Sequence, residues 1–328
     1  MLTDLPVHRW LVFDDSWPAA TVDFLLNFLE VGTEEVVYDP FVGCGTTPVV
    51  CAGYGLSTYS ADISSLAILT TKVKLTAWSQ NVIDTTEAVI KSEGIETLLH
   101  DFVHRALKEK QRDIPVELIQ FVLAATLLRG GWHKGVAIQV AELQNRAIEL
   151  INEIRSDTFS LTKTKLSHAT NCSDFHLIDP MEIHSLAQDN LVFVSSPPFY
   201  GSNTNPAKQR IANLINENNN LKSRVSPPKT WVLSNASSIL ENISIDNPKY
   251  SMIYEYLFFL NSIVEHVAKL GCRAAALEMG PKWLDGKLVR FDSFIAELLL
   301  QHNYQITLFK KGSEAAAEEI TLICAERL

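Results

Sequence analysis

The feature that most constrains the fold is an apolar run that ends in an acid and leads into a glycine turn. Val36-Val37-Tyr38-Asp39 has the β-branched and aromatic residues of a buried strand. Gly43 and Gly45 allow a tight turn and the close approach of a ligand to the backbone. A helix is expected over 46–54, and a second strand over 57–62 again ends in an acid. This strand–helix–strand unit predicts a parallel sheet with right-handed crossovers.

The rest of the chain extends this α/β pattern. An amphipathic helix through Val22 and Leu29, capped by Asp15 or Ser16, precedes the first strand. We interpret 79–160 as a helical insertion or subdomain, and 1–78 with 161–328 as the domain built around the sheet. Further elements are expected as a helix over 64–75, helices ending at Leu128 and over 135–155, strands over 167–172, 191–194 and 272–278, helices over 250–269 and 290–301, and a terminal β-hairpin over 303–310 and 318–325.

Composition places the chain among ordinary globular proteins. It has 328 residues, of which 47% are hydrophobic and 20% charged. No apolar run reaches about 18 residues and no basic stretch precedes an apolar run at the start, so neither a transmembrane helix nor a signal peptide is expected. The five cysteines show no C-x-x-C spacing, which argues against zinc and against a disulfide framework. A reduced, cytoplasmic setting is therefore expected, without a membrane partner.

The two acids that end the predicted strands suit one kind of ligand. Asp39 lies where open α/β sheets bind ligands, and its carboxylate could bind an ammonium group. Backbone amides from Gly43 to Thr46 would face a carboxylate at the helix N-terminus. Asp62 is placed for ribose hydroxyls, or alternatively for capping the turn at Ser64. An ammonium, a carboxylate and a ribose are the polar parts of S-adenosylmethionine.

A second motif follows the predicted strand over 191–194. In Ser196-Pro197-Pro198-Phe199 the prolines remove backbone donors and fix the chain, which leaves rigid carbonyl groups. The Ser196 hydroxyl and the Pro197 carbonyl can accept hydrogen bonds from an amino group, and Phe199 offers a stacking face. Taken alone, this stretch also fits a plain Pro-Pro loop with a core aromatic residue.

Together the two motifs resemble those of a known family. Asp39-Pro40-Phe41-Val42-Gly43-Cys44-Gly45-Thr46-Thr47 is similar to the cofactor motif of amino-group DNA methyltransferases, with Cys44 in place of the more usual Ser. Ser196-Pro197-Pro198-Phe199 is similar to their catalytic motif. His8-Arg9-Trp10 resembles the cofactor-flanking segment, and Ala61-Asp62-Ile63-Ser64 resembles the ribose-binding turn. The cofactor motif precedes the catalytic motif here, whereas many relatives with the Asp-Pro-Phe form have the two halves permuted.

The resemblance implies a Rossmann-like, seven-stranded sheet, mostly parallel with a C-terminal antiparallel hairpin, and S-adenosylmethionine as cofactor. It implies transfer of a methyl group to an exocyclic amine of a flipped DNA base. Ser196 in the first motif position favours cytosine N4 over adenine N6. Asp174 would contact the cofactor's adenine, or else face solvent. The implied cofactor residues are Asp39, Pro40, Phe41, Gly43, Cys44, Gly45, Thr46, Thr47, Asp62 and Asp174, and the implied catalytic residues are Ser196, Pro197, Pro198 and Phe199.

The net charge of −10 counts mildly against unaided, tight binding to DNA. The segment 201–248, rich in Asn, Ser, Pro and Lys, is expected to be a mobile loop with local positive charge. Nucleic-acid contact by this loop is a hypothesis, with a solvated linker as the alternative. Its candidate contacts are Lys208, Arg210, Lys222 and Arg224.

Other readings of the sequence remain open. His100 and His104 have a spacing that can bind metal, but without a third ligand they are interpreted as a surface pair, so no metal site is predicted. An RNA guanine-N2 methyltransferase shares the motif order, and a catalytically silent scaffold subunit would fit the acidity. The DNA enzyme could work beside a restriction or recognition protein as partner.

Overall fold

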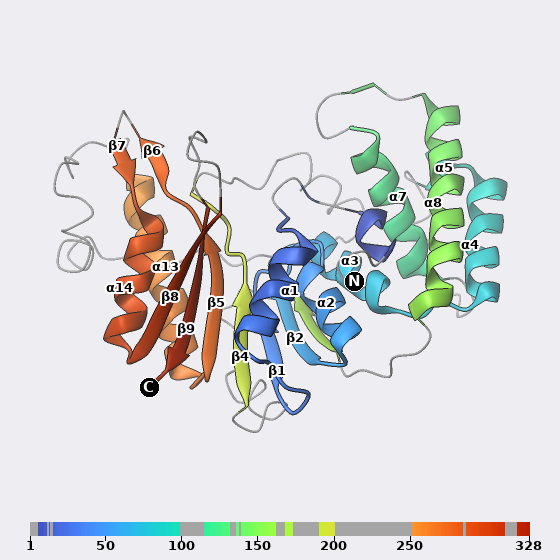
Figure 1. Ribbon diagram of the computed structural model, residues 1–328. Coiled ribbons are helices and arrows are strands. Elements are labelled where there is room, and N and C mark those ends of the chain that lie inside the picture. The colour runs from blue at the N-terminus through green and yellow to red at the C-terminus, as the bar shows by residue number, and fades with distance from the viewer. Residues whose placement is uncertain are drawn as a thin grey trace.

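The chain forms an α/β structure around one large sheet. The computed structural model describes residues 6–11, 13, 16–98, 115–131, 136–137, 139–161, 168–172, 190–200, 251–284, 287–311 and 320–328. The sheet strands are β1 (Val36–Asp39), β2 (Ser57–Asp62), β3 (His168–Cys172), β4 (Leu191–Ser195), β5 (Ala274–Met279), β8 (Tyr304–Lys311) and β9 (Ile320–Arg327). They pair in the order β3-β2-β1-β4-β5-β9-β8 (Figure 1).

Strand direction confirms the predicted Rossmann-like, seven-stranded fold. The five strands from β3 to β5 pair in parallel, while β9 is antiparallel to both β5 and β8. The order of β3, β2, β1, β4 and β5 is that of a dinucleotide-binding sheet. In such a sheet the direction of winding reverses between β1 and β4. Ligands bind at the carboxyl ends of the strands at that point.

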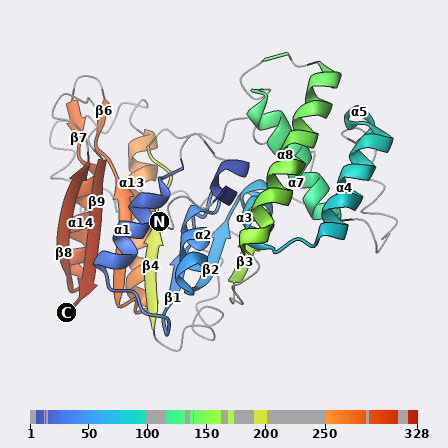
Figure 2. The same cartoon turned by 45° about the vertical axis from the view of Figure 1, so that its right-hand side comes forward.

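Both faces of the sheet are buried, because alternate strand residues point to opposite sides. Tyr38, Phe193 and Leu277 face α13 (Ser251–Lys269) and α14 (Phe291–Gln301). Val37, Val192 and Ala276 face α1 (Ala19–Phe28) and α2 (Thr46–Tyr54). Figures 1 and 2 show these two helical layers on either side of the strands. The central strands therefore read as continuous apolar runs rather than as alternating ones.

The helices of the segment 79–160 pack against the edge of this domain. They are α4 (Gln80–Glu93), α5 (Ile95–Thr97), α7 (Val116–Arg129) and α8 (Val140–Leu161). Helix α7 is buried along 118–128, between α4, α8 and α3 (Ser65–Leu75). Figures 1 and 2 place this group beyond the β3 edge of the sheet. The helical segment thus shares its apolar core with α3 of the sheet domain.

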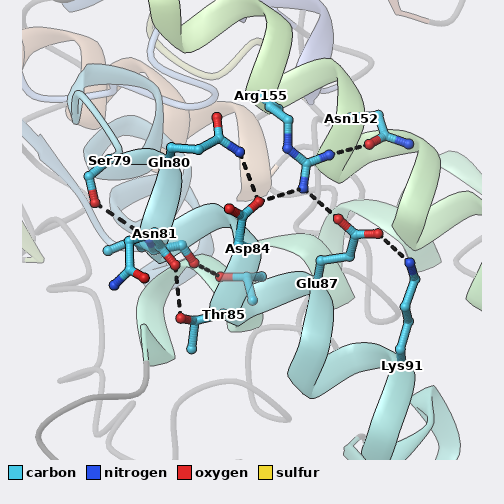
Figure 3. Close-up of polar contacts among 11 residues, drawn as sticks. Ser79, Gln80, Asn81, Asp84, Thr85, Glu87, Lys91, Asn152 and Arg155 are labelled. Carbon is cyan, nitrogen blue, oxygen red and sulfur yellow. Dashed lines mark hydrogen bonds and ion pairs between the residues drawn. The ribbon is translucent and has the colours of Figure 1, made fainter.

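Polar contacts on α8 join the helices of this segment (Figure 3). The Arg155 guanidinium lies 3.2 Å from the Asp84 carboxylate and 2.5 Å from that of Glu87, both on α4. Glu153 binds Arg129 of α7 through both carboxylate oxygens, at 2.9 and 3.2 Å. Exposed ion pairs contribute little each, so the apolar core holds the segment and these contacts fix its register.

Most predicted elements are confirmed, with boundaries shifted by a few residues, and α8 begins later and ends later than expected. The expected cap position of α1 at Asp15 or Ser16 is wrong. Pro18 occupies the cap position, and the Ser16 hydroxyl instead accepts from the Phe13 amide at 3.2 Å. The hairpin of β6 (Lys282–Leu284) and β7 (Lys287–Val289) and the short 3₁₀ helix η2 (Pro6–Trp10) were not predicted from the sequence. Within the described ranges, no helix has the length and apolarity needed to cross a membrane.

Candidate active site

Four polar residues gather at the carboxyl edge of the sheet, where three neighbouring strands end. Asp39 is the last residue of β1, and Ser195 is the last of β4. Ser196 follows directly, and Glu278 is the second-last residue of β5. Because β4 lies between β1 and β5, its end is flanked by an acid on each side. This edge coincides with the reversal in winding, where α/β sheets bind ligands.

Asp39 is a buried acid, only 2% exposed. Its Oδ1 accepts hydrogen bonds from the Ser195 hydroxyl at 2.5 Å and from the Phe41 amide at 3.1 Å. Burial nevertheless raises the pKa of Asp39 to about 6, while these two donors and the nearby Thr47 hydroxyl act against the shift. The Thr47 hydroxyl itself makes no hydrogen bond of standard distance and angle among the described residues. No basic side chain of the described residues offsets the Asp39 charge.

Asp62 joins the glycine turn to the next strand. Its Oδ2 accepts from the Gly43 amide at 3.0 Å, and its Oδ1 accepts from the Ser64 amide at 2.8 Å. Burial raises the pKa of Asp62 to about 6, and the two amides act in the opposite sense. Ser64, not Asp62, caps α3 by accepting from the Ala67 amide at 3.4 Å. A carboxylate has about four acceptor positions, so Asp62 keeps acceptors for a ligand.

The two glycines of the turn have different roles. Both have a positive φ, of 53° at Gly43 and 83° at Gly45. A Cβ on Gly45 would lie 2.9 Å from the Thr71 Oγ1 and 3.2 Å from the Thr71 Cα, so this glycine lets α2 pack closely on α3. A Cβ on Gly43 would meet nothing nearer than the Phe41 oxygen at 3.9 Å. Among the described residues, a side chain at Gly43 would therefore make ordinary contacts, whereas one at Gly45 would overlap α3.

The expectation that the amides from Gly43 to Thr46 face a ligand is wrong for two of them. The Gly43 amide donates to Asp62, as described above, and the Gly45 amide donates to the Val42 oxygen at 2.9 Å. Val42 in turn donates to the Ala61 oxygen at 3.0 Å, which fixes the turn against β2. Two of the predicted ligand donors are thus used within the protein.

A buried lysine holds the N-terminal segment against the same turn. The Lys74 ammonium, on α3, donates to the Leu11 oxygen at 2.6 Å and to the Cys44 oxygen at 2.9 Å. Burial lowers the pKa of Lys74. The Cys44 thiol lies 2.8 Å from the Ser16 hydroxyl, a second contact between the two segments. Lys74 was not predicted from the sequence, because its partners lie in the N-terminal segment and the turn.

The segment His8-Arg9-Trp10 reaches the helical segment as well as the turn. The Trp10 Nε1 donates to the Asp157 Oδ2 at 2.7 Å, and the Arg9 guanidinium lies 2.8 Å from the Oδ1 of the same carboxylate on α8. Burial beside Lys74 lowers the pKa of His8 to about 4. The side chains of Arg9 and Trp10 therefore bind α8. Leu11 and Ser16, which follow them in the chain, lie beside the turn.

The remaining residues of the cofactor motif support the turn. Phe41 is partly buried, and its ring lies 5.5 Å from that of Phe259 on α13. Thr46 and Thr47 begin α2 and are buried, and the Thr46 hydroxyl lies 3.5 Å from the Cys44 thiol. Pro40 is buried between β1 and the turn. These residues set the path of the chain from the strand to the helix.

The Ser-Pro-Pro-Phe motif is held from two sides. The Ser196 hydroxyl donates to the Glu278 Oε2 at 3.3 Å. The Tyr256 hydroxyl, on α13, donates to the Pro198 oxygen at 3.0 Å. Tyr200, which follows Phe199, stacks on Phe291 with ring centroids 5.4 Å apart. The motif thus leaves β4 along a path fixed by β5, α13 and α14.

Three residues of this site escaped the sequence analysis: Ser195, Tyr256 and Glu278. Glu278 carried a usable signal, because it ends the strand expected over 272–278, as Asp39 and Asp62 end theirs. Asp174, Lys208, Arg210, Lys222 and Arg224 lie outside the described residues, as do His100, His104 and the loop 201–248. Among the described residues, no group of three or more His, Cys, Asp or Glu side chains could hold a metal ion.

Comparisons with known proteins give weak matches. No family model and no curated protein sequence matches the chain. The magnesium protoporphyrin IX methyltransferase (ChlM) from Synechocystis PCC 6803 with bound SAM is similar with a TM-score of 0.38 and 8% identity, over 98% of this chain and 89% of that chain. The rRNA methyltransferase aviRa from Streptomyces viridochromogenes gives a TM-score of 0.35 and 11% identity, over 96% and 89%. Similarity this low assigns no activity, and the fold rests on the strand order.

Proposed function

We propose that this chain uses S-adenosylmethionine to methylate an exocyclic amino group of a DNA base, with cytosine N4 favoured over adenine N6. The observation that carries the proposal is the pair of consecutive serines at the end of β4. Ser195 binds Asp39, the residue proposed to hold the cofactor. Ser196, the first residue of the proposed catalytic motif, binds Glu278 on β5. The two halves of the reaction would therefore meet at one strand end.

The described residues fit the polar parts of the cofactor. Asp39 and Asp62 are acids whose pKa values are raised by burial, and the charge of Asp62 raises that of Asp39 further. A cation placed between them would stabilise both carboxylates, which suits an ammonium group near Asp39. Asp62 retains acceptors for ribose hydroxyls beside its two amide donors. When bound, S-adenosylmethionine would supply an electrophilic methyl group on a sulfonium.

The Ser-Pro-Pro-Phe motif fits an amine as the acceptor. An exocyclic amine of a base is a poor nucleophile, because its lone pair is delocalised into the ring. The Ser196 hydroxyl and the Pro197 oxygen would accept its two N–H groups and hold the nitrogen in place. Tyr256 binds the oxygen of Pro198, not that of Pro197. Preorganised acceptors and positioning are the main sources of rate enhancement in such a site.

DNA as substrate follows from the likeness of both motifs to the amino-group DNA methyltransferases. The stacking face of Phe199 suits a flipped base. The basic residues Lys208, Arg210, Lys222 and Arg224 remain the proposed contacts with the nucleic-acid backbone. Because the chain is acidic overall, a recognition or restriction protein is proposed as a partner that strengthens DNA binding.

Transfer of tritium from methyl-labelled S-adenosylmethionine tests the proposal. The purified protein is incubated with unmethylated genomic DNA or with total RNA, and the labelled base is identified by chromatography after hydrolysis. We expect label in N4-methylcytosine, and at least a hundredfold less with Ser196→Ala, which binds the cofactor normally. Label in RNA guanine alone would replace DNA by RNA as substrate. Cofactor binding without transfer to either would indicate a silent subunit.

A further inference from the structure

We infer that Glu278 is a positioning residue that fixes the Ser196 hydroxyl as a hydrogen-bond acceptor, so that the site selects amino groups over carbonyl groups. The inference rests on the proposed function and adds to it the residue that sets its chemical specificity. Glu278 is only 4% exposed, and its Oε2 lies 3.3 Å from the Ser196 Oγ. The two residues come from neighbouring strands, since Ser195 pairs with Leu277 in register.

The direction of this hydrogen bond follows from the chemistry of the two groups. A hydroxyl has one proton and two lone pairs, whereas a carboxylate only accepts. When the Ser196 proton points to Glu278, only lone pairs remain for a substrate. A distance of 3.3 Å is long for such a bond, but hydrogen bonds in catalytic sites often tighten only when the substrate is bound.

Among the described residues, the nearest other acid on this strand edge is bound to a different serine. On the other side of β4, Asp39 accepts the hydroxyl proton of Ser195. Each serine therefore donates to a different acid: Ser195 to Asp39 on β1, and Ser196 to Glu278 on β5. Tyr256 fixes the following carbonyl at Pro198. The motif would therefore present acceptors, not donors, to the group that enters beside it.

This polarity distinguishes bases that differ in one exocyclic group and in the proton on the adjacent ring nitrogen. Cytosine carries an amino group at position 4 where uracil carries an oxygen, and adenine carries one at position 6 where hypoxanthine carries an oxygen. An acceptor at Ser196 binds the amino group and repels the oxygen. A site built to hydrogen-bond one polar group rejects an analogue that lacks it, because a buried partner is left unpaired.

Binding of nucleotides that form amine and carbonyl pairs tests the inference without any transfer reaction. The probes are dCMP against dUMP and dAMP against dIMP, titrated by NMR into protein saturated with S-adenosylhomocysteine. For at least one pair we expect the wild-type protein to prefer the amine by about tenfold, which corresponds to one hydrogen bond. In Glu278→Gln the amide can donate to Ser196 and free its proton, so the preference falls to about twofold. Glu278→Asp, which is too short to reach Ser196, is expected to fall equally.

Two further variants separate this role from a structural one. Ser196→Ala is expected to lose the preference, and adding Glu278→Gln to it should change nothing more. Asp157→Asn neutralises another carboxylate that is also 4% exposed, but far from this motif, and should keep the tenfold preference. If folded Glu278→Gln and Glu278→Asp keep the wild-type preference, the inference alone is overturned. If the wild-type protein prefers no amine, amino-group methylation fails and the inference fails with it.

Discussion

The Ser195 hydroxyl donates a 2.5 Å hydrogen bond to the Asp39 carboxylate across 156 positions of the sequence. Parallel pairing of β1 with β4 brings the two residues together. Tyr38 pairs with Phe193, and Asp39 follows one residue after Tyr38 while Ser195 follows two residues after Phe193. Even with this bond, burial raises the pKa of Asp39 to about 6. The protein therefore keeps a destabilising acid at the point proposed for the cofactor ammonium, a cost often found at functional sites.

Asp39→Asn should stabilise the cofactor-free protein while removing cofactor binding. The amide oxygen can still accept from Ser195 and Phe41, and the cost of a buried charge disappears. At pH 8 we expect the free energy of unfolding to rise by about 2 kcal/mol, which is below the limit set by a pKa raised from 3.8 to about 6. The dissociation constant for S-adenosylmethionine should rise at least a hundredfold. Thermal unfolding and calorimetry measure the two effects, and a loss of stability would contradict this account.

Cofactor affinity should depend on pH through the same group. An ammonium binds the ionised carboxylate, so affinity should fall up to tenfold per pH unit below about pH 6 and stay level above it. Calorimetric titrations between pH 5 and 8 measure this. Asp62 titrates in the same range and contributes to the fall. An affinity that does not change across this interval would show that Asp39 is ionised throughout.

The stability of the free protein should respond in the opposite sense. A carboxyl whose folded pKa is raised binds its proton more tightly in the folded state, so its contribution falls as pH rises from about 4 to 6. His8, whose pKa is lowered from 6.5 to about 4, adds stability as pH rises through that window. The test therefore compares the free energy of unfolding of the wild-type protein with that of Asp39→Asn. The advantage of Asp39→Asn over the wild-type protein should grow as the pH rises from 4 to 7.

Gly45→Ala should destabilise the protein far more than Gly43→Ala. Both positions have a positive φ, which costs a residue with a Cβ about 1 kcal/mol or more. Only at Gly45 does the new Cβ also overlap Thr71, so we expect a loss of about 3 kcal/mol there and about 1 kcal/mol at Gly43. Urea unfolding measures both. Adding Thr71→Ala should recover part of the Gly45→Ala loss, and no recovery would rule out the overlap as its cause.

Tyr256→Phe should slow methyl transfer without weakening cofactor binding. The substitution removes the donor that fixes the Pro198 oxygen, so the catalytic motif is held less firmly, and we expect the single-turnover rate to fall about tenfold. Tyr304→Phe is the matched control, because its hydroxyl donates to the Cys272 oxygen at 2.8 Å, away from the motif. Both should cost about 1 kcal/mol of stability. Equal transfer rates in the two variants would contradict the positioning role of Tyr256.

Trp10→Phe should weaken the attachment of the N-terminal segment to the helical segment. The Trp10 indole is fully buried and donates to the Asp157 carboxylate. Phenylalanine is smaller, so it leaves a cavity, and it cannot donate this hydrogen bond to Asp157. We expect a loss of about 3 kcal/mol by thermal unfolding. Trp283→Phe, at a tryptophan that is 55% exposed, should change stability by no more than about 0.5 kcal/mol. Equal effects would mean that the Trp10 contacts contribute nothing.

Local patterns predicted the parts of the fold that depend on neighbours in sequence. The run from Val36 to Thr47 contains its own strand, turn and helix start, so β1 and α2 lie where expected. Asp39 and Asp62 could be placed at one edge because consecutive parallel strands end on the same side. The hairpin of β6 and β7 was also within reach, since Asp285-Gly286 between two short runs that contain apolar residues is a hairpin signal.

Contacts that depend on strand order could not be predicted from local patterns. Glu278 ends a strand expected from the sequence, but only the pairing of β4 with β5 brings its side chain to Ser196. Lys74 reads as a surface lysine of α3 until the N-terminal segment is folded over it. The expected cap at Ser16 was wrong because its hydroxyl is engaged with Phe13 and Cys44. In each case a tertiary contact decided what the local pattern left undetermined.

Because Ser195 and Ser196 are consecutive, the covalent backbone fixes the distance between them. Consecutive Cα atoms are about 3.8 Å apart across a trans peptide bond, and that length does not vary with packing or temperature. Reacting atoms in a methyl transfer must come within roughly 3.5 Å of each other. If donor and acceptor are each held through one of these serines, a single covalent unit limits how far their separation can drift. Inserting one residue between the serines would then disable transfer even if both binding sites stayed intact.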